Sequence, residues 1–313
     1  MTHCHLLVQP GAHQSTRGYS DLKQLGRAYL STGDKSNALH CFKTLQEATP
    51  TDKDVLYDLA HLYASEQEYI TALYHFKEAS RHFPNNPYIH SHMAYVLFKL
   101  EDYEGAVEEY RQAIEYGDDP VWTATIAQTL GTIFYQVYGQ HDEALDLFLL
   151  ADELDPDNTD CKIMLGELYF EAGQLQDALD LYREVLSKDP LNAECYNYIG
   201  YLLWQLDQND DAIAAYEQAL VLDGKNSTAL NNLGVIYLDE FYQADKAKVY
   251  FESALAHKPS YTLAAFNLGR AKEGLGERAE AAKAYTLAQS LNEVQQDIDP
   301  LEIQDRISQL FEM

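Results

Sequence analysis

A pattern of small and apolar residues recurs eight times between Tyr19 and Asn292, with a period of about 34 residues. The small residue that begins each unit is Gly26, Ala60, Ala94, Gly131, Gly166, Gly200, Gly234 or Gly269. An alanine follows 12 or 13 residues later, at Ala38, Ala72, Ala106, Ala144, Ala178, Ala212, Ala247 and Ala281. Four residues after each alanine comes an aromatic: Phe42, Phe76, Tyr110, Phe148, Tyr182, Tyr216, Phe251 and Tyr285. A repeat of this length predicts paired helices stacked in an array.

The spacings explain how such an array would pack. Residues four apart lie on the same face of a helix, so the alanine and the aromatic share one face of the second helix. Glycine or alanine in the first helix lets the neighbouring helix approach closely. Each hairpin then buries its apolar face by stacking on the next. The pattern predicts an all-α fold of antiparallel helix hairpins, with a proline closing most units, at Pro50, Pro84, Pro156, Pro190 and Pro259.

This register resembles that of the tetratricopeptide repeats, and the resemblance covers residues 19–292. It implies a right-handed superhelical solenoid in which the first helix of each hairpin lines the concave side. Large side chains occupy the positions that point inward in this family: Tyr57, His61, Tyr88, Tyr95, Phe98, Tyr135, Phe170, Tyr201 and Trp204. Since packing does not require aromatics at exposed positions, we expect some of these rings to form a binding groove.

The regions outside the repeats differ in composition. Residues 1–18 show no helical period and contain Pro10 and Gly11, so we expect a flexible leader. Residues 293–313 form an acidic linker and a final helix. Asp299 can cap that helix, with Pro300 at its first position and Glu302 placed to complete a capping box. The apolar residues Ile303, Ile307, Leu310 and Phe311 recur on one face, which predicts a helix that caps the last repeat.

Two repeats contain one extra residue. Gly131 and Ala144 are 13 residues apart, and so are Gly234 and Ala247, against 12 in the other repeats. We expect the surplus in the turns between helices, near residues 136–141 and 239–243. The sequence is compatible with three interpretations of the extra residue: a longer turn, an extended first helix, or a rim that contacts a partner.

The charge of the chain narrows the choice of partner. The sequence contains 50 acidic and 22 basic residues, for a net charge of −28. The negative electrostatic field of such a chain repels nucleic acid and attracts basic proteins, although the same charge also favours solubility.

The sequence shows neither a secretory leader nor a membrane span of roughly 18 apolar residues. Four scattered cysteines do not form a disulfide framework. Cys161 and Cys195 lie one period apart, on stacked helices whose axes would be about 8–10 Å apart, which is too far for a disulfide. We therefore expect free thiols and a cytoplasmic protein.

No motif in the sequence predicts catalysis, a cofactor or a metal site. Asp207, Asn209 and Asp211 have the alternating spacing of a calcium loop, but the required glycine is Ala212 and the final glutamate is Gln218. Histidines and a cysteine cluster near the N-terminus without a scaffold to fix them, at His3, Cys4, His5 and His13. We expect no enzyme activity.

The resemblance also allows two kinds of binding groove to be tested on the sequence. Chaperone-binding relatives hold a carboxylate in a clamp of cations and asparagines; here Lys23 and Arg27 are followed by Asp58, which breaks the clamp. Other relatives use an inner ladder of asparagines, of which this chain has a partial version at Asn197, Asn231, Asn232 and Asn267. Acidic residues gather around repeats five and six, at Asp160, Glu167, Glu171 and Glu194, and favour a ligand with apolar anchors and a cationic end.

These observations predict a non-enzymatic scaffold or adaptor that binds a peptide segment or protein partner in an aromatic, acidic concave groove. Two alternatives remain: a self-assembling homo-oligomer, and a targeting or regulatory subunit of an enzyme complex. The sequence predicts no binding of nucleic acid and no insertion into membranes.

Overall fold

The computed structural model describes residues 16–312, and this part of the chain is built from α-helices and one π-helix without any strand. These residues divide into two compact units, of which the first ends at Asp157 and the second begins at Asn158. The helices of the first unit are α2 (Thr16–Ser31), α3 (Lys35–Ala48), α4 (Lys53–Ser65), α5 (Tyr69–His82), α6 (Pro87–Lys99), α7 (Tyr103–Tyr116), α8 (Pro120–Ile133), the π-helix η1 (Phe134–Tyr138) and α9 (His141–Leu154). Those of the second are α10 (Thr159–Glu171), α11 (Leu175–Lys188), α12 (Ala193–Gln205), α13 (Asn209–Leu222), α14 (Ser227–Asp239), α15 (Ala244–His257), α16 (Thr262–Gly274), α17 (Arg278–Gln295) and α18 (Pro300–Glu312).

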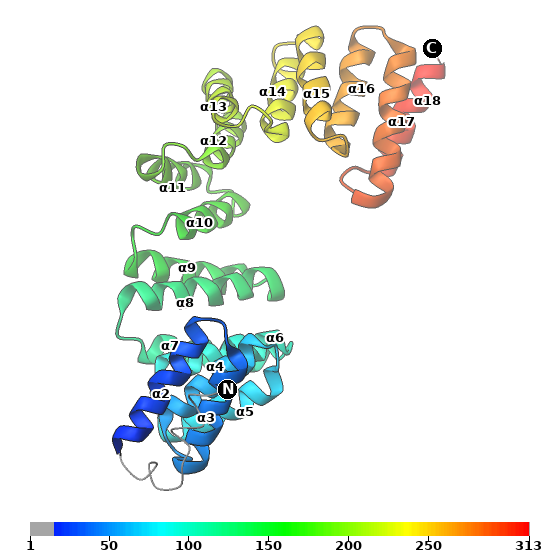
Figure 1. The fold of residues 1–313 in the computed structure, drawn as a ribbon. Helices are drawn as coiled ribbons and strands as arrows, with labels where there is room; N and C mark the ends of the chain where they lie inside the picture. Colours follow the sequence, from blue (N-terminus) through cyan, green and yellow to red (C-terminus); the bar gives the residue numbers. More distant parts are fainter. Residues whose placement is uncertain (1–15, 313) are drawn as a thin grey trace. The chain divides into compact units, whose positions relative to one another are not determined.

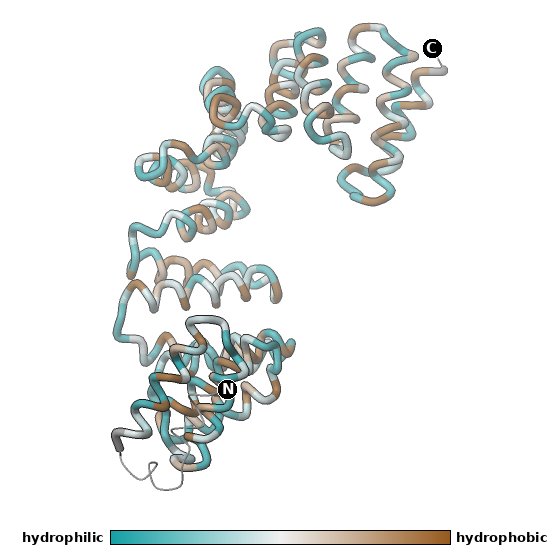
Figure 2. Tube along the Cα trace, in the orientation of Figure 1, coloured by the Kyte–Doolittle hydropathy of each residue, from teal (hydrophilic) through white to brown (hydrophobic). Residues whose placement is uncertain are grey.

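Each even-numbered helix from α2 to α16 packs against the helix that follows it, and the resulting hairpins stack in order within each unit (Figure 1). Hydrophobic and hydrophilic stretches alternate along the helices of both units (Figure 2). The predicted all-α solenoid of helix hairpins is confirmed.

The repeated small residue and the repeated aromatic meet inside each hairpin. A Cβ atom added to Gly234 would lie 2.5 Å from the ring of Phe251, and one added to Gly269 would lie 2.5 Å from the ring of Tyr285. Both aromatics are fully buried. In these two hairpins the ring occupies the space that a side chain would need, so close packing requires glycine there.

Every hairpin turn contains one residue in the left-handed backbone region, two positions before the second helix begins. Four are glycines and four are not: Gly33, Gly139, Gly173, Gly276, Gln67, Glu101, Asp207 and Tyr242. This conformation reverses the chain after the first helix. The amide of Glu68, for example, donates to the carbonyl of Tyr63.

The surplus residues of repeats four and seven lengthen the turn that is closed by a backbone hydrogen bond before the second helix. Gln140 donates to the carbonyl of Phe134, and Gln243 donates to the carbonyl of Tyr237, six residues back instead of five. In repeat four the first helix continues as the π-helix η1, so the surplus lies in an extended helix and not in the turn alone. In repeat seven it lies in the turn after α14.

The predicted capping helix is confirmed as α18. The Asp299 carboxylate accepts the backbone N–H of Leu301, while Ile303 and Leu310 are buried against the last hairpin. The helix boundaries differ from the predicted segments: α2 begins at Thr16, inside the expected leader, and α17 continues past Asn292 to Gln295. The remainder of the leader and its His–Cys cluster lie outside the described residues.

The side chains of Cys41, Cys161 and Cys195 are buried. Among the described helices, none is both long enough and apolar enough to cross a bilayer.

Candidate functional site

Two of the predicted groove residues of the first unit, Tyr57 and His61, form an aromatic cluster with His92 on α4 and α6. The ring of Tyr57 lies 6.2 Å from that of His61 and 5.4 Å from that of His92. The Nδ1–H of His92 faces the Tyr88 carbonyl at 2.7 Å, which leaves Nε2 to accept from the Tyr57 hydroxyl at 3.4 Å. Burial lowers the pKa of His92, so its ring is neutral at neutral pH. The rings of this cluster therefore mainly contact one another.

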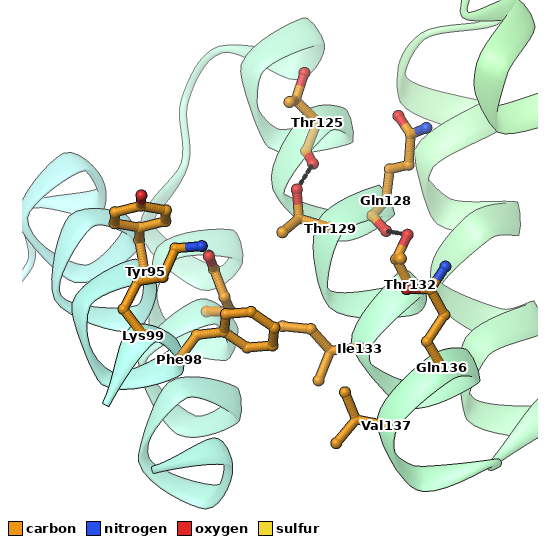
Figure 3. Close-up of a pocket in the computed structure, with 11 residues that line it drawn as sticks. Tyr95, Phe98, Lys99, Thr125, Gln128, Thr129, Thr132, Ile133, Gln136 and Val137 are labelled. Carbon is orange, nitrogen blue, oxygen red and sulfur yellow. Dashed lines mark hydrogen bonds between the residues drawn. The ribbon is translucent and has the colours of Figure 1, made fainter. Parts of the chain in front are cut away.

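Tyr95 and Phe98 line a cavity of about 460 Å³ between α6 and α8. The facing wall comes from one side of α8 and from η1, with Thr125, Thr129, Ile133 and Val137 among its residues (Figure 3). Below we call this the α6–α8 pocket.

Two other predicted residues of the first unit lie apart from this pocket. Tyr88 is 41% exposed and its ring is 4.7 Å from that of Trp122. Tyr135 lies beside His141, with 5.2 Å between ring centres. The sequence pattern placed all of these rings on one face but did not distinguish their surroundings.

In the second unit, three predicted aromatics follow one another. Phe170 and Tyr201 meet edge to face at 5.4 Å, and Tyr201 and Trp204 do so at 5.9 Å. The Trp204 indole N–H donates to Glu240, in the turn after α14. Phe170 and Tyr201 line a second cavity, and Trp204 is not among its lining residues.

This second cavity, here called the α10–α14 pocket, has a volume of about 340 Å³. It is lined by Glu167, Phe170, Tyr182, Asn197, Tyr198, Tyr201, Leu202, Thr228 and Asn232. Four of these residues were predicted as binding residues: Phe170, Asn197, Tyr201 and Asn232. The Asn197 Oδ1 atom is buried and has no hydrogen-bond partner in the described part of the chain.

Two carboxylates accept hydrogen bonds from Tyr198, one of the residues that line this pocket. The Tyr198 hydroxyl donates to Glu167 at 2.8 Å and to Glu194 at 3.3 Å, and the ring stacks on Tyr182. Burial and the hydrogen bond to Glu167 raise the pKa of Tyr198 well above its ordinary value, so the phenol stays neutral. Two carboxyl groups therefore lie beside an apolar cavity, with a neutral phenol between them. Tyr198 was not predicted as a site residue, and its acidic neighbours were the available signal.

The remaining asparagines of the predicted ladder bond to one another. Asn267 donates to Asn231 at 3.1 Å, Asn231 donates to Asn232 at 3.2 Å, and Asn232 donates to the Tyr216 hydroxyl at 3.1 Å. Asn231 and Asn267 are buried. In this structure they join α14 to α16, and Asn232 is the member of the network that reaches the pocket.

The cations of the first repeat are paired with acids of the second. Lys23 contacts both Asp52 and Asp54, and the Arg27 Nε–H donates to Asp58 at 2.7 Å. Asp58 therefore neutralises one of the two cations that could have held a carboxylate. Within the described residues, no group of three or more His, Cys, Asp or Glu side chains is arranged to hold a metal ion.

Family models described as tetratricopeptide repeat match more than half of the chain. One matches residues 23–87, 163–226 and 199–240, a second matches residues 63–129, and a third matches residues 264–295. No protein with a curated description matches the sequence.

Solved structures of repeat proteins share the fold. The C-terminal part of a TPR repeat-containing protein from Cytophaga hutchinsonii has a TM-score of 0.65 at 15% identity, covering 78% of this chain and 98% of its own. Pseudomonas aeruginosa PilF has a TM-score of 0.54 at 18% identity, covering 72% and 97%. YrrB, a TPR protein with an unusual peptide-binding site, has a TM-score of 0.53 at 21% identity, covering 61% and 96%.

Proposed function

The chain belongs to the tetratricopeptide repeat family, and from that membership we propose that it is a non-enzymatic scaffold or adaptor that binds a peptide segment of a partner protein. Stacked hairpins expose extended surfaces that suit such partners. We assign the main contact to the α10–α14 pocket of the second unit.

One observation carries this assignment: aromatic rings, amides and carboxylates converge on the same cavity. Phe170 and Tyr201 provide an apolar wall for a partner side chain. Asn197 and Asn232 can bond the backbone of an extended chain, because an amide both donates and accepts. The buried Asn197 Oδ1 atom has no partner among the described residues, which costs about 1–3 kcal/mol, and a ligand N–H that drew this side chain toward the cavity would remove that cost.

The charge around the pocket indicates a cationic partner. Glu167 and Glu194 stand at its edge, and the whole chain has a net charge of −28. Electrostatic attraction would steer a basic segment toward this surface and weaken as salt is added. The proposed ligand therefore carries a large apolar side chain next to a lysine or arginine.

The test uses short acetylated and amidated peptides with the sequence Gly-Ser-Phe-Xaa-Gly-Ser, in which the phenylalanine carries a fluorine and Xaa is Lys, Gln or Glu. Fluorine NMR reports their binding to the full chain. We expect the Lys peptide to bind through this pocket, and the combined changes Phe170→Ala and Tyr201→Ala to weaken it by about 10-fold or more, as for truncated anchor residues.

Tyr74→Ala is the matched control, because Tyr74 is 60% exposed on α5 of the other unit. It should leave binding unchanged. Undiminished binding of the Lys peptide by the Phe170→Ala/Tyr201→Ala variant would refute the assignment.

A further inference from the structure

The α6–α8 pocket has the opposite electrostatic character. Its lining contains one cation, Lys99, and no carboxylate, although acids outnumber bases 50 to 22 in the chain. The Lys99 ammonium lies 5.4 Å from the ring centre of Tyr95 and 5.9 Å from that of Phe98. It forms no ion pair with the described residues. A positive charge thus lies over the aromatic wall, and none of the residues that line the pocket carries a carboxylate.

The walls of this pocket leave apolar surface open to a ligand. Tyr95 is 45% exposed and Val137 is 41% exposed, whereas Tyr110 beneath them is buried. Burial raises the pKa of Tyr110 to about 12, so its phenol is neutral at neutral pH and adds no negative charge. The cavity can therefore hold a large apolar side chain close to the Lys99 ammonium.

A row of threonines along α8 adds hydrogen-bond acceptors. The hydroxyls of Thr125, Thr129 and Thr132 donate to carbonyls of their own helix at 3.1, 2.8 and 2.9 Å. Figure 3 shows the bonds of Thr129 and Thr132. Because their protons are used in this way, their oxygens can accept from a ligand but the hydroxyls are poor donors to it. Backbone N–H groups of a peptide suit this wall, and a carboxylate does not.

The irregular repeat helps to build the pocket. Gln136 and Val137, which line it, both lie in the π-helix η1 that accommodates the surplus residue of repeat four. η1 is the last turn of the first helix of this repeat, so the surplus residue places these two side chains in the lining. The irregularity therefore supports a binding role through an observation independent of the charge.

We propose that the α6–α8 pocket is a second binding site, for a peptide segment in which a large apolar side chain is followed directly by a carboxylate. The side chain enters between Phe98 and Val137, the carboxylate pairs with Lys99, and peptide N–H groups donate to the threonine oxygens. This site prefers the charge opposite to that proposed for the second unit.

The same fluorinated peptides test this site. We expect the Phe-Glu peptide to bind the full chain, and Lys99→Glu to weaken it by about 10-fold or more while strengthening the Phe-Lys peptide, as expected for reversal of a close charge. Val137→Asp should also weaken the Phe-Glu peptide. Circular dichroism checks that both variants keep their helix content. An affinity for the Phe-Glu peptide that is unchanged by Lys99→Glu would overturn the proposal.

Two further variants locate the effect. Lys77→Glu, at an exposed position on α5, makes the same charge change outside the pocket and should leave Phe-Glu binding unchanged. The Phe170→Ala/Tyr201→Ala variant should also keep this binding, so this site and the proposed function can fail independently. Loss of Phe-Glu binding in that variant would place the carboxylate site in the second unit and refute the inference.

Discussion

At the scale of single residues, the repeated positions are explained by contacts within one hairpin. The glycine and the aromatic that faces it are about 16 residues apart and recur in phase, so the sequence alone identifies them. Other residues take their properties from neighbours that vary between repeats. Arg27 could be predicted as a cation on the groove face, but only the structure shows its charge paired with Asp58.

His90 is a residue of this second kind. Its ring lies between α6 and α7, with Nδ1 2.6 Å from a Glu109 oxygen and Nε2 2.6 Å from the Pro84 carbonyl. Both neighbours are acceptors, so this site favours the imidazolium form, in which both ring nitrogens donate. The hydrogen bond to Glu109 raises the pKa of His90, although burial acts in the opposite direction.

This arrangement predicts a pH-dependent contribution to stability. Because the pKa in the folded chain exceeds the unfolded value of about 6.5, the contribution is complete below that pH and is lost as the pH rises through the folded pKa. Urea unfolding of the native chain and His90→Gln should therefore differ most below about pH 6.5. His75 and His92, whose pKa values burial lowers, are present in both proteins and cancel in the difference. A difference that grew with pH would contradict this account.

At the scale of the elements, the hairpin turns share one backbone conformation but not one residue type. Left-handed backbone strains residues with a side chain, yet Gln67 and Tyr242 adopt it with φ values of 62° and 56°. The glycines of the other turns indicate where chain reversal occurs. The shared repeat register would have extended that prediction to the turns without glycine.

We expect Gln67→Gly to raise the free energy of unfolding by about 1 kcal/mol, because glycine removes the left-handed strain. Gly173→Ala should lower it by a similar amount, since Gly173 has a φ of 76°. Thermal and urea unfolding measure both changes. Gln67→Ala is the control, because it removes the same side chain but keeps the strain, and a gain equal to that of Gln67→Gly would exclude this explanation.

At the scale of the whole molecule, the chain consists of two compact units. In repeat arrays each hairpin is stabilised by its neighbours, so cooperative unfolding extends only as far as the stacking is continuous. A single two-state transition is therefore not expected.

Calorimetry of the full chain should show two unfolding transitions. Gly269→Ala should lower the midpoint temperature of only one of them. The added Cβ would lie 2.5 Å from the ring of Tyr285, and overpacking of this kind costs typically about 1–3 kcal/mol. Gly224→Ala is the control in the same unit, because its nearest neighbour would be 3.7 Å away. A single transition, whose midpoint temperature fell in the Gly269→Ala variant, would show that the two units unfold together.

The sequence by itself determined the helix hairpins, their order and the capping helix. These features depend on helical periodicity and on contacts between residues less than one repeat apart, both of which recur in phase. Only the tertiary structure decided which aromatics line a pocket, which asparagines bond to one another and where the surplus residue of repeat four lies. These outcomes depend on side chains of adjacent repeats, such as Asn231 and Asn267, whose contacts cannot be inferred from the period because each repeat presents different neighbours.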